Sequence, residues 1–172
     1  MSDYLTDVRP ADPLLTVRRA VEADDAALLA IDRTAWDATS GFPSYQEIVR
    51  DTFFVRGGPE VHLVALYNGE VVGYVRLQDK YSFPEGAGVL AINGIAVAQN
   101  ARRRGVASAL LEAATAEGRR RGARKISLHV HGTNAAARRL YEHHGYVVEG
   151  THPNEFLIEG TYIEKVDMAK ML

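Results

Sequence analysis

The spacing of apolar residues predicts a chain that mixes strands with amphipathic helices. Residues Leu15–Arg19 alternate between apolar and polar side chains, as a short strand does. From residue 23 to 36 the apolar residues recur at the spacing of one helix face. A second helix is predicted over residues 44–53, because Ser44 and Glu47 match a capping box ahead of further apolar residues. The chain is therefore expected to begin with one strand and two helices.

The middle of the chain carries the clearest hairpin signal. Val61–Tyr67 and Val71–Gln78 both have strand patterns, and Asn68-Gly69 between them suits a tight type I′ turn. A further strand, Val89–Val97, follows after a loop, so this region predicts a meander of antiparallel strands. A helix is expected to start at about Val106 and to end at Gly118 or Gly122. It is followed by a strand over Lys125–His131, a helix over Asn134–His144, and strands over Tyr146–Glu149 and Tyr162–Met171.

This order of elements predicts an α/β (α+β) protein with a mixed, mostly antiparallel sheet of about seven strands and flanking helices. We expect one domain over residues 15–172, preceded by a flexible arm over residues 1–14, where apolar periodicity is weak. A dinucleotide-binding fold is excluded because the chain has no G-x-G-x-x-G sequence. A Walker A loop is excluded because no Gly-Lys-Ser/Thr is present.

Composition narrows the classes of function. The 172 residues include no cysteine, which excludes disulfides, cysteine-ligated zinc and a thiol nucleophile. The net charge of −2 argues against a nucleic-acid-binding protein. No apolar run approaches the roughly 18 residues of a membrane span, and the N-terminus has no signal-peptide pattern. We therefore expect a cytoplasmic protein that contacts neither membrane nor nucleic acid.

The most informative segment runs from Asn93 to Leu111, where an apolar strand passes through a short basic loop into an amphipathic helix. A helix that opens at about Gly105 leaves its first backbone N–H groups without partners at the positive end of the helix dipole, which suits a phosphate or pyrophosphate. Gly105 and Ala107 have little or no side chain, so an anion can approach the backbone closely. Arginines at the mouth of the loop add charged donors.

Two motifs in this order resemble the GCN5-related N-acetyltransferase (GNAT) family. The first is Arg102-x-x-Gly105-x-Ala107, which is similar to the acyl-CoA-binding motif of that family. The second runs from Ile126 to Tyr146, where a strand, an Asn, a helix containing Leu-Tyr and a Gly-aromatic pair follow one another. The resemblance implies a single-domain acyl-CoA N-acyltransferase fold in which strands 4 and 5 splay apart. It also implies acetyl-CoA as co-substrate and acetyl transfer to an amine in a ternary complex.

The resemblance also assigns roles to individual residues. Pantetheine would pair with the main chain of the fourth strand, and the amide of Asn134 would bind the pantetheine arm, although Asn134 also suits a helix N-cap. Tyr141 would act as the catalytic general acid on the departing thiolate, although it also suits a core aromatic. The expected acetyl-CoA-binding residues are Ile95, Ala96, Val97, Arg102, Arg103, Arg104, Gly105, Val106, Ala107, Ser108, Asn134 and Tyr141.

The general base is left open. Some relatives have a Glu where this chain has Asn93, and an amide cannot take a proton from the attacking amine. The alternatives are His129 or His131, which share a strand face, Glu47, or ordered water relayed by Asn93. The His-x-His pair has no third ligand defined by the sequence, so we expect no metal.

The acceptor is also left open among small amines, amino-acid analogues and protein N-termini, and a homodimer remains one option for the assembly. A non-catalytic acyl-CoA sensor is the alternative to an enzyme. Aromatic residues that could line an acceptor pocket, or serve as core, are Trp36, Phe42, Tyr45, Phe53, Phe83, Phe156 and Tyr162.

Overall fold

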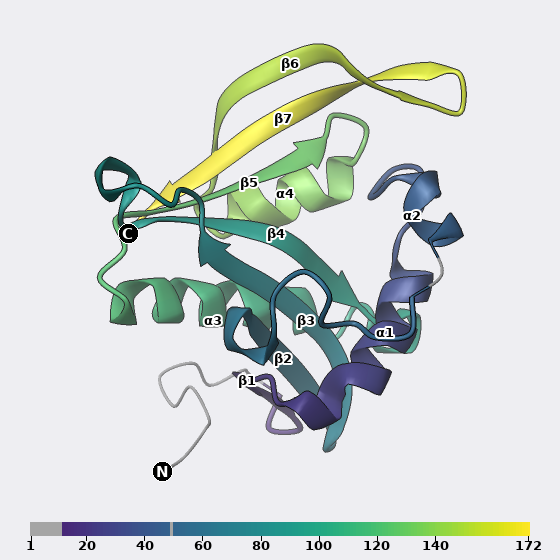
Figure 1. The fold of residues 1–172 in the computed structure, drawn as a ribbon, viewed down its shortest axis with the longest axis vertical. Coiled ribbons are helices and arrows are strands. Elements are labelled where there is room, and N and C mark those ends of the chain that lie inside the picture. Colours follow the sequence, from purple (N-terminus) through teal and green to yellow (C-terminus); the bar gives the residue numbers. More distant parts are fainter. Residues whose placement is uncertain (1–11, 49) are drawn as a thin grey trace.

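The computed structural model of the protein describes residues 12–48 and 50–172. Seven strands form one sheet in the order β1-β2-β3-β4-β5-β7-β6, and every neighbouring pair is antiparallel except β4 and β5. Figure 1 shows that β4 and β5 lie close together at one end and diverge toward the other, with helices on the faces of the sheet. The strands are β1 Leu15–Arg19, β2 His62–Tyr67, β3 Glu70–Asp79, β4 Val89–Val97, β5 Lys125–His131, β6 Val147–Ile158 and β7 Thr161–Met171.

Two hydrophobic clusters hold helices to opposite faces of this sheet. Val75 on β3 belongs to the cluster that includes α3 and Tyr141 of α4, whereas the adjacent Tyr74 packs with α1. Successive strand residues point to opposite faces, so α1 covers one face and α3 with α4 the other. The helices are α1 Asp25–Ala35, α2 Pro43–Glu47, α3 Val106–Arg120 and α4 Ala135–His143, with 3₁₀ turns at Glu22–Asp24, Pro59–Val61, Pro84–Gly86 and Gln99–Ala101.

Several predictions that rest on local backbone chemistry are confirmed. Asn68 and Gly69 join β2 to β3 with φ of 50° and 83°, as a type I′ turn requires. Helix α3 begins directly after Gly105 and ends at Arg120, and Gly122 has a φ of 72°. Of the two glycines proposed to end that helix, Gly122 is therefore the one that does, because its left-handed conformation turns the chain away.

The predicted helix over residues 44–53 is wrong in length. Helix α2 ends at Glu47, and no side chain caps its start, so the expected capping box does not form. The reason is a contact from α1: the Asp25 carboxylate accepts the backbone N–H of Phe53 at 3.0–3.1 Å and that of Phe54 at 3.0 Å. It also accepts the hydroxyl of Thr52 at 2.7 Å. These bonds hold the segment in a turn instead of a helix.

The strand predicted over Tyr146–Glu149 is also longer than expected. Strand β6 runs from Val147 to Ile158 and pairs with β7 despite Pro153 and the left-handed Asn154. Because β6 lies at the edge of the sheet, a residue without an N–H is tolerated there. The pairing register shifts around these residues, between His152 and Phe156.

Strands β4 and β5 pair in parallel only where Val89–Ala91 faces Lys125–Ser127. Beyond these residues both strands continue without pairing to each other, so the expected splay is confirmed together with the mixed seven-stranded sheet. Most of the arm predicted over residues 1–14 lies outside the described residues. Within the described part of the chain, every helix is too short or too polar to cross a bilayer.

Candidate functional site

The gap between β4 and β5 leaves main chain of β4 unpaired on one side. Ile95, Ala96 and Val97 pair with β3 on the other side, where Val75 faces Ile95 and Gly73 faces Val97. All three β4 residues line a cavity of about 670 Å³, which we name the central cavity. An extended polar chain can therefore pair with this edge of β4 as an added strand would.

The N-terminus of α3 opens beside this cavity. Gly105 is the N-cap residue with a φ of 76°, and nothing lies within 4 Å of the position that a Cβ would occupy. The first backbone bond into the helix is from Ala109 N–H to the Gly105 carbonyl at 3.0 Å. The N–H groups between these two residues therefore have no partner within the helix, which suits a bound anion. Ala107 lines the central cavity.

The side chains predicted to bind phosphates differ in where they point. Arg102 lines the central cavity and donates to the Ala35 carbonyl at 3.4 Å. The guanidinium of Arg104 lies over the Tyr67 ring at 4.8 Å. Arg103 has a left-handed φ of 62°.

Two further residues of the predicted set have their side chains engaged elsewhere. The hydroxyl of Ser108 is paired with His144 Nε2 at 2.9 Å. Val106 is 2% exposed and packs in the core. Only the backbone N–H groups of these two residues are available to a ligand.

Asn134 and Tyr141 lie on α4 and line the same cavity. The side-chain Oδ1 of Asn134 accepts a hydrogen bond from the Ala137 N–H at 3.1 Å, so its N-cap role is confirmed. Its amide nitrogen has no hydrogen-bond partner among the described residues, which leaves it available to a ligand.

Tyr141 is 7% exposed and sits 5.9 Å from Tyr146 between ring centroids. Burial raises the pKa of Tyr141 to about 12. Its hydroxyl has no hydrogen-bond partner in the described part of the chain and is not among the fully buried unpaired atoms, whereas that of Tyr146 is buried and unpaired. The Tyr141 hydroxyl therefore faces the cavity as a protonated group at neutral pH.

Asn93 stands at a β-bulge in β4. The β3–β4 register passes from Arg76 opposite Gly94 to Leu77 opposite Ile92, so Asn93 is the extra residue and its side chain is exposed. Bulges turn a side chain toward a site. Asn93 shares the central cavity with His129, whose pKa is lowered first by desolvation and then by the charge of Lys165.

The other candidate bases are less open. His131 is 4% exposed and packs against Phe42 and Phe156, with ring centroids 5.0 and 5.5 Å away. Its Nδ1 is buried with no hydrogen-bond partner among the described residues. Burial lowers the pKa of His131, opposed by a hydrogen bond with the Ala38 backbone. Glu47 does not line the central cavity.

A second cavity of about 600 Å³ lies next to the first, and we name it the α1–α2 cavity. Asp32 of α1 lines it and accepts hydrogen bonds from Trp36 Nε1 at 2.8 Å, from the Tyr74 hydroxyl at 2.5 Å and from Arg50. Burial acts to raise the pKa of Asp32, but these donors outweigh it and the pKa is lowered. Asp32 is thus an ionised carboxylate that already accepts three hydrogen bonds from the protein. The residues that line both cavities are Trp36, Tyr45, Arg56, Arg76, Asn93 and Gly94.

The aromatic residues predicted for an acceptor pocket divide into two groups. Trp36 and Tyr45 line both cavities, Phe42 lines the central cavity and Phe53 lines the α1–α2 cavity. The others lie outside both: Phe83, Phe156 and Tyr162. Sequence reasoning did not single out Arg56, Arg76, Asp32 and Tyr74; a charged residue in the middle of a central strand was the available signal for Arg76.

Comparison with known proteins gives one family. The model of the acetyltransferase (GNAT) family matches residues 26–146. An uncharacterized N-acetyltransferase of Bacillus subtilis strain 168, YhfO, is 27% identical over 143 residues, which are 77% of this chain and 89% of the relative.

Solved structures agree with this match. The ribosomal-protein-alanine N-acetyltransferase from Brucella melitensis has 26% identity and a TM-score of 0.74, covering 91% of this chain and 99% of its own. The structure of yncA, a putative acetyltransferase from Salmonella typhimurium solved with its cofactor acetyl-CoA, has a similar fold, with a TM-score of 0.71 and 23% sequence identity. The match covers 92% of this chain and 94% of yncA. The family model spans more than half of the chain, and the protein therefore belongs to the GNAT family of acetyl-CoA-dependent N-acetyltransferases.

Proposed function

We propose that the protein transfers the acetyl group of acetyl-CoA directly to a primary amine while both substrates are bound. One observation carries this proposal: the unpaired edge of β4, the start of α3, Asn134 and Tyr141 all line a single cavity. That cavity continues into the α1–α2 cavity through shared residues. The first cavity suits the acetyl donor, and the second suits the acceptor.

The residues present fit acetyl-CoA. The backbone of Ile95 to Val97 would pair with the pantetheine arm, since this edge of β4 has no strand beside it. The free N–H groups after Gly105 would bind the pyrophosphate, with Arg102 and Arg103 at the mouth of the loop. The amide nitrogen of Asn134 would donate to the arm. Acetyl-CoA supplies the thioester.

Tyr141 and the β4 backbone would then carry the chemistry. Attack by the uncharged amine nitrogen forms a bond to the acetyl carbon and moves an electron pair onto the carbonyl oxygen; when that pair returns, the carbon–sulfur bond breaks and the thiolate leaves. Tyr141 gives its phenolic proton to the departing thiolate, and main-chain N–H groups of β4 stabilise the developing oxyanion. The Asn93 amide cannot accept the proton that the attacking nitrogen loses, so solvent in the cleft takes it. Asn93 would orient that solvent. Solvent returns a proton to Tyr141 after the thiol leaves.

Acetyl-CoA binding tests the donor half of this proposal. Gly105→Val adds a side chain at the start of α3, where the phosphates would lie, and should weaken acetyl-CoA binding in calorimetric titration by at least tenfold. Gly122→Val is the matched control, because Gly122 lies beyond the opposite end of the same helix, with a φ of 72° and an equally open Cβ position. Both variants suffer the same backbone strain, so only the location differs. Equal affinities in two folded variants would remove the loop from the site.

Thiol release tests the transfer half. Purified protein should release CoA from acetyl-CoA in the presence of at least one member of a panel of amines, amino acids and peptides, with the acetylated amine found by mass spectrometry. Tight acetyl-CoA binding with no acetylated product from any member would support a non-catalytic sensor instead.

A further inference from the structure

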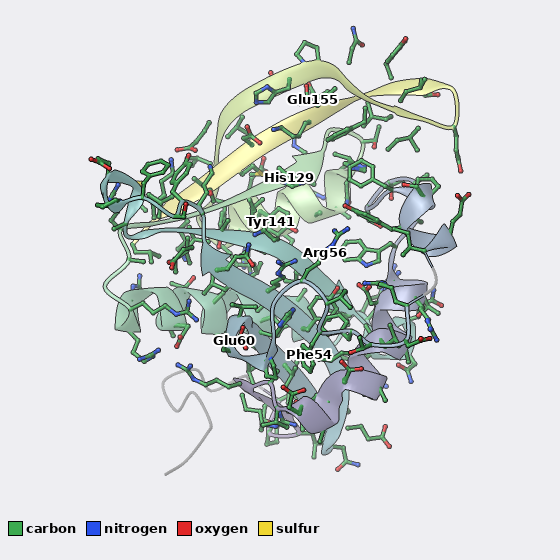
Figure 2. The ribbon with its side chains drawn as sticks, in the orientation of Figure 1. Phe54, Arg56, Glu60, His129, Tyr141 and Glu155 are labelled. Atoms are coloured by element: carbon green, nitrogen blue, oxygen red, sulfur yellow. The ribbon has the colours of Figure 1, made fainter. Side chains whose placement is uncertain are left out.

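Two arginines stand at the junction of the two cavities. Arg56 belongs to the loop after α2, and Arg76 lies in the middle of β3. Both line the central cavity and the α1–α2 cavity. Figure 2 shows Arg56 between α2 and the β4 side of the sheet, with Tyr141 and His129 beyond it toward β5. The pair therefore lies between the proposed donor and acceptor spaces.

Neither guanidinium has a carboxylate partner within residues 12–48 and 50–172. Arg76 Nε donates to Gln78 Oε1 at 3.0 Å, which orients the group without neutralising it. Arg56 donates to the Tyr45 hydroxyl at 3.3 Å, and its guanidinium lies over that ring at 5.1 Å. In Figure 2 the labelled Glu60 and Glu155 both lie away from Arg56.

The carboxylates that line these cavities are already engaged. Asp32 is held by Arg50 and by two further donors. Asp37 accepts from the backbone and hydroxyl groups of Thr39 and Ser40, at 2.6–3.1 Å. Among the described residues, five arginines and only these two carboxylates line the two cavities, so the walls keep a positive charge that the carboxylates do not balance.

Holding two guanidinium groups near each other is unfavourable. The pKa of Arg76 is lowered first by desolvation and then by the charge of Arg56. An anion between the two groups would remove this repulsion and gain charge-assisted hydrogen bonds. Planar guanidinium groups match the paired oxygens of a carboxylate or phosphate in particular.

We propose that Arg56 and Arg76 bind an anionic oxygen group of the acceptor, so that the substrate is a small amine that carries a carboxylate or phosphate close to its nitrogen. The strand register supports this closeness: Arg76 is directly opposite Gly94, and both residues line the two cavities. Gly94 precedes Ile95, where the β4 edge that would bind the pantetheine arm begins, so Arg76 stands beside the proposed place of acetyl transfer. An α-amino acid carries its carboxylate on the carbon next to its amine, whereas the N-terminus of a protein lacks this carboxylate. This inference rests on the acetyl transfer proposed above.

The test compares acceptors that differ only in the anionic group. Initial rates are measured with acetyl-CoA and each α-amino acid, with the carboxamide of the same amino acid, and with short peptides that present the same N-terminal residue. Phosphoethanolamine against ethylamine is the phosphate arm, which distinguishes phosphate from carboxylate. We expect kcat/KM for the best acid to exceed that of its amide at least tenfold. An amide lowers the basicity of the neighbouring amine, so intrinsic reactivity at neutral pH would favour the opposite order.

Variants locate the preference. Arg76→Gln and Arg56→Gln should each raise KM for the best acid about 10- to 100-fold while leaving kcat/KM for its amide and KM for acetyl-CoA within about twofold. Arg76→Lys keeps the charge but loses the paired donors, so it should restore part of the affinity. Arg124→Gln is the matched control: Arg124 lines neither cavity and donates to the carbonyls of Ala87 and Glu85, so its loss should not change the acid preference.

Two results overturn the inference: amides or peptide N-termini acetylated as well as the acids, or a rise in KM for acetyl-CoA in the two Gln variants, which would assign the arginines to the donor. Failure of the proposed function looks different. Acetyl-CoA would then bind, and no amine of either kind would be acetylated.

Discussion

Replacing Tyr141 by phenylalanine is the sharpest test of the chemical step. The substitution keeps the ring, which packs in the core, and removes only the hydroxyl that faces the central cavity. That hydroxyl has no hydrogen-bond partner among the described residues, so its loss breaks no contact within the protein. A change in rate would therefore report on what the hydroxyl does to the substrate.

The size of the effect follows from the environment of the phenol. Burial raises the pKa of Tyr141 to about 12, whereas an ordinary thiol has a pKa of roughly 8.5. Proton transfer to a free thiolate would be uphill, but the same dry cavity also raises the proton affinity of the departing sulfur. General acids contribute about 10²–10⁴ in rate when well matched. With this mismatch we expect a 10- to 10³-fold loss, or about 1.4–4 kcal/mol in the activation free energy.

Single-turnover acetyl transfer is the measurement, because slow product release could hide a change in the chemical step. The dissociation constant of acetyl-CoA should change little, since the lost interaction acts mainly in the transition state. Tyr146→Phe is the matched control. Tyr146 is a neighbouring buried tyrosine that does not line the central cavity, and its buried hydroxyl has no hydrogen-bond partner in residues 12–48 and 50–172. Its removal should leave the transfer rate unchanged and leave stability unchanged or raised by up to about 2 kcal/mol.

Two results would refute the reasoning. If Tyr141→Phe transfers acetyl as fast as the unmodified protein in a single turnover, the phenol is not the acid. If both Phe variants lose rate equally, the loss comes from packing in the tyrosine pair and not from proton transfer.

Two further predictions concern a base and a buried charge. The Asn93→Glu variant should fold normally because the side chain at this position is exposed. If the new carboxylate takes the amine proton, the acidic limb of the pH–rate profile should move to lower pH. Loss of folding would instead show that the bulge needs the amide. Glu117 is buried among Arg19, Arg120 and Arg121, whose hydrogen bonds outweigh burial and lower its pKa from 4.5 to about 2. Because its pKa is lowered in the folded state, ionised Glu117 stabilises the fold above about pH 4.5, and this contribution is lost as the pH falls toward 2. Denaturant titrations should therefore show at most about 3 kcal/mol of pH-dependent stability that the Glu117→Gln variant lacks.

Features set by neighbouring residues could be predicted from the sequence. The turn at Asn68-Gly69 and the start of α3 after Gly105 depend on backbone angles that few residue types adopt, so the residue types signal them directly. The cap at Asn134 is local in the same way. The start of α3 and Asn134 also belong to the two motifs from which acetyl-CoA was predicted as co-substrate.

Features set by distant residues could not. Helix α2 stops early because Asp25 of α1 takes the N–H groups of Phe53 and Phe54, and no local pattern contains that contact. The junction of Arg56 with Arg76 depends on how a loop folds over β3: Arg56 looks like an ordinary surface charge in the sequence, and the strand position of Arg76 does not indicate its partner. The charged part of the proposed acceptor site therefore has no local motif, although the aromatic residues Trp36 and Tyr45 of the same cavities could be named from the sequence.

This division has a physical cause in how the two proposed subsites are built. The proposed donor contacts are mostly main chain, from Ile95 to Val97 and after Gly105, and main-chain geometry demands particular small or turn-forming residues nearby. The proposed acceptor contacts are side chains, chiefly Arg56 and Arg76, that different elements bring to one cavity wall. A side chain on the loop after α2 can change without disturbing the β4 edge or the start of α3, because no backbone hydrogen bond of those elements depends on it. Acceptor preference can therefore vary among proteins that keep the same donor site, and the acceptor has to be inferred from assembled charge instead of from a motif.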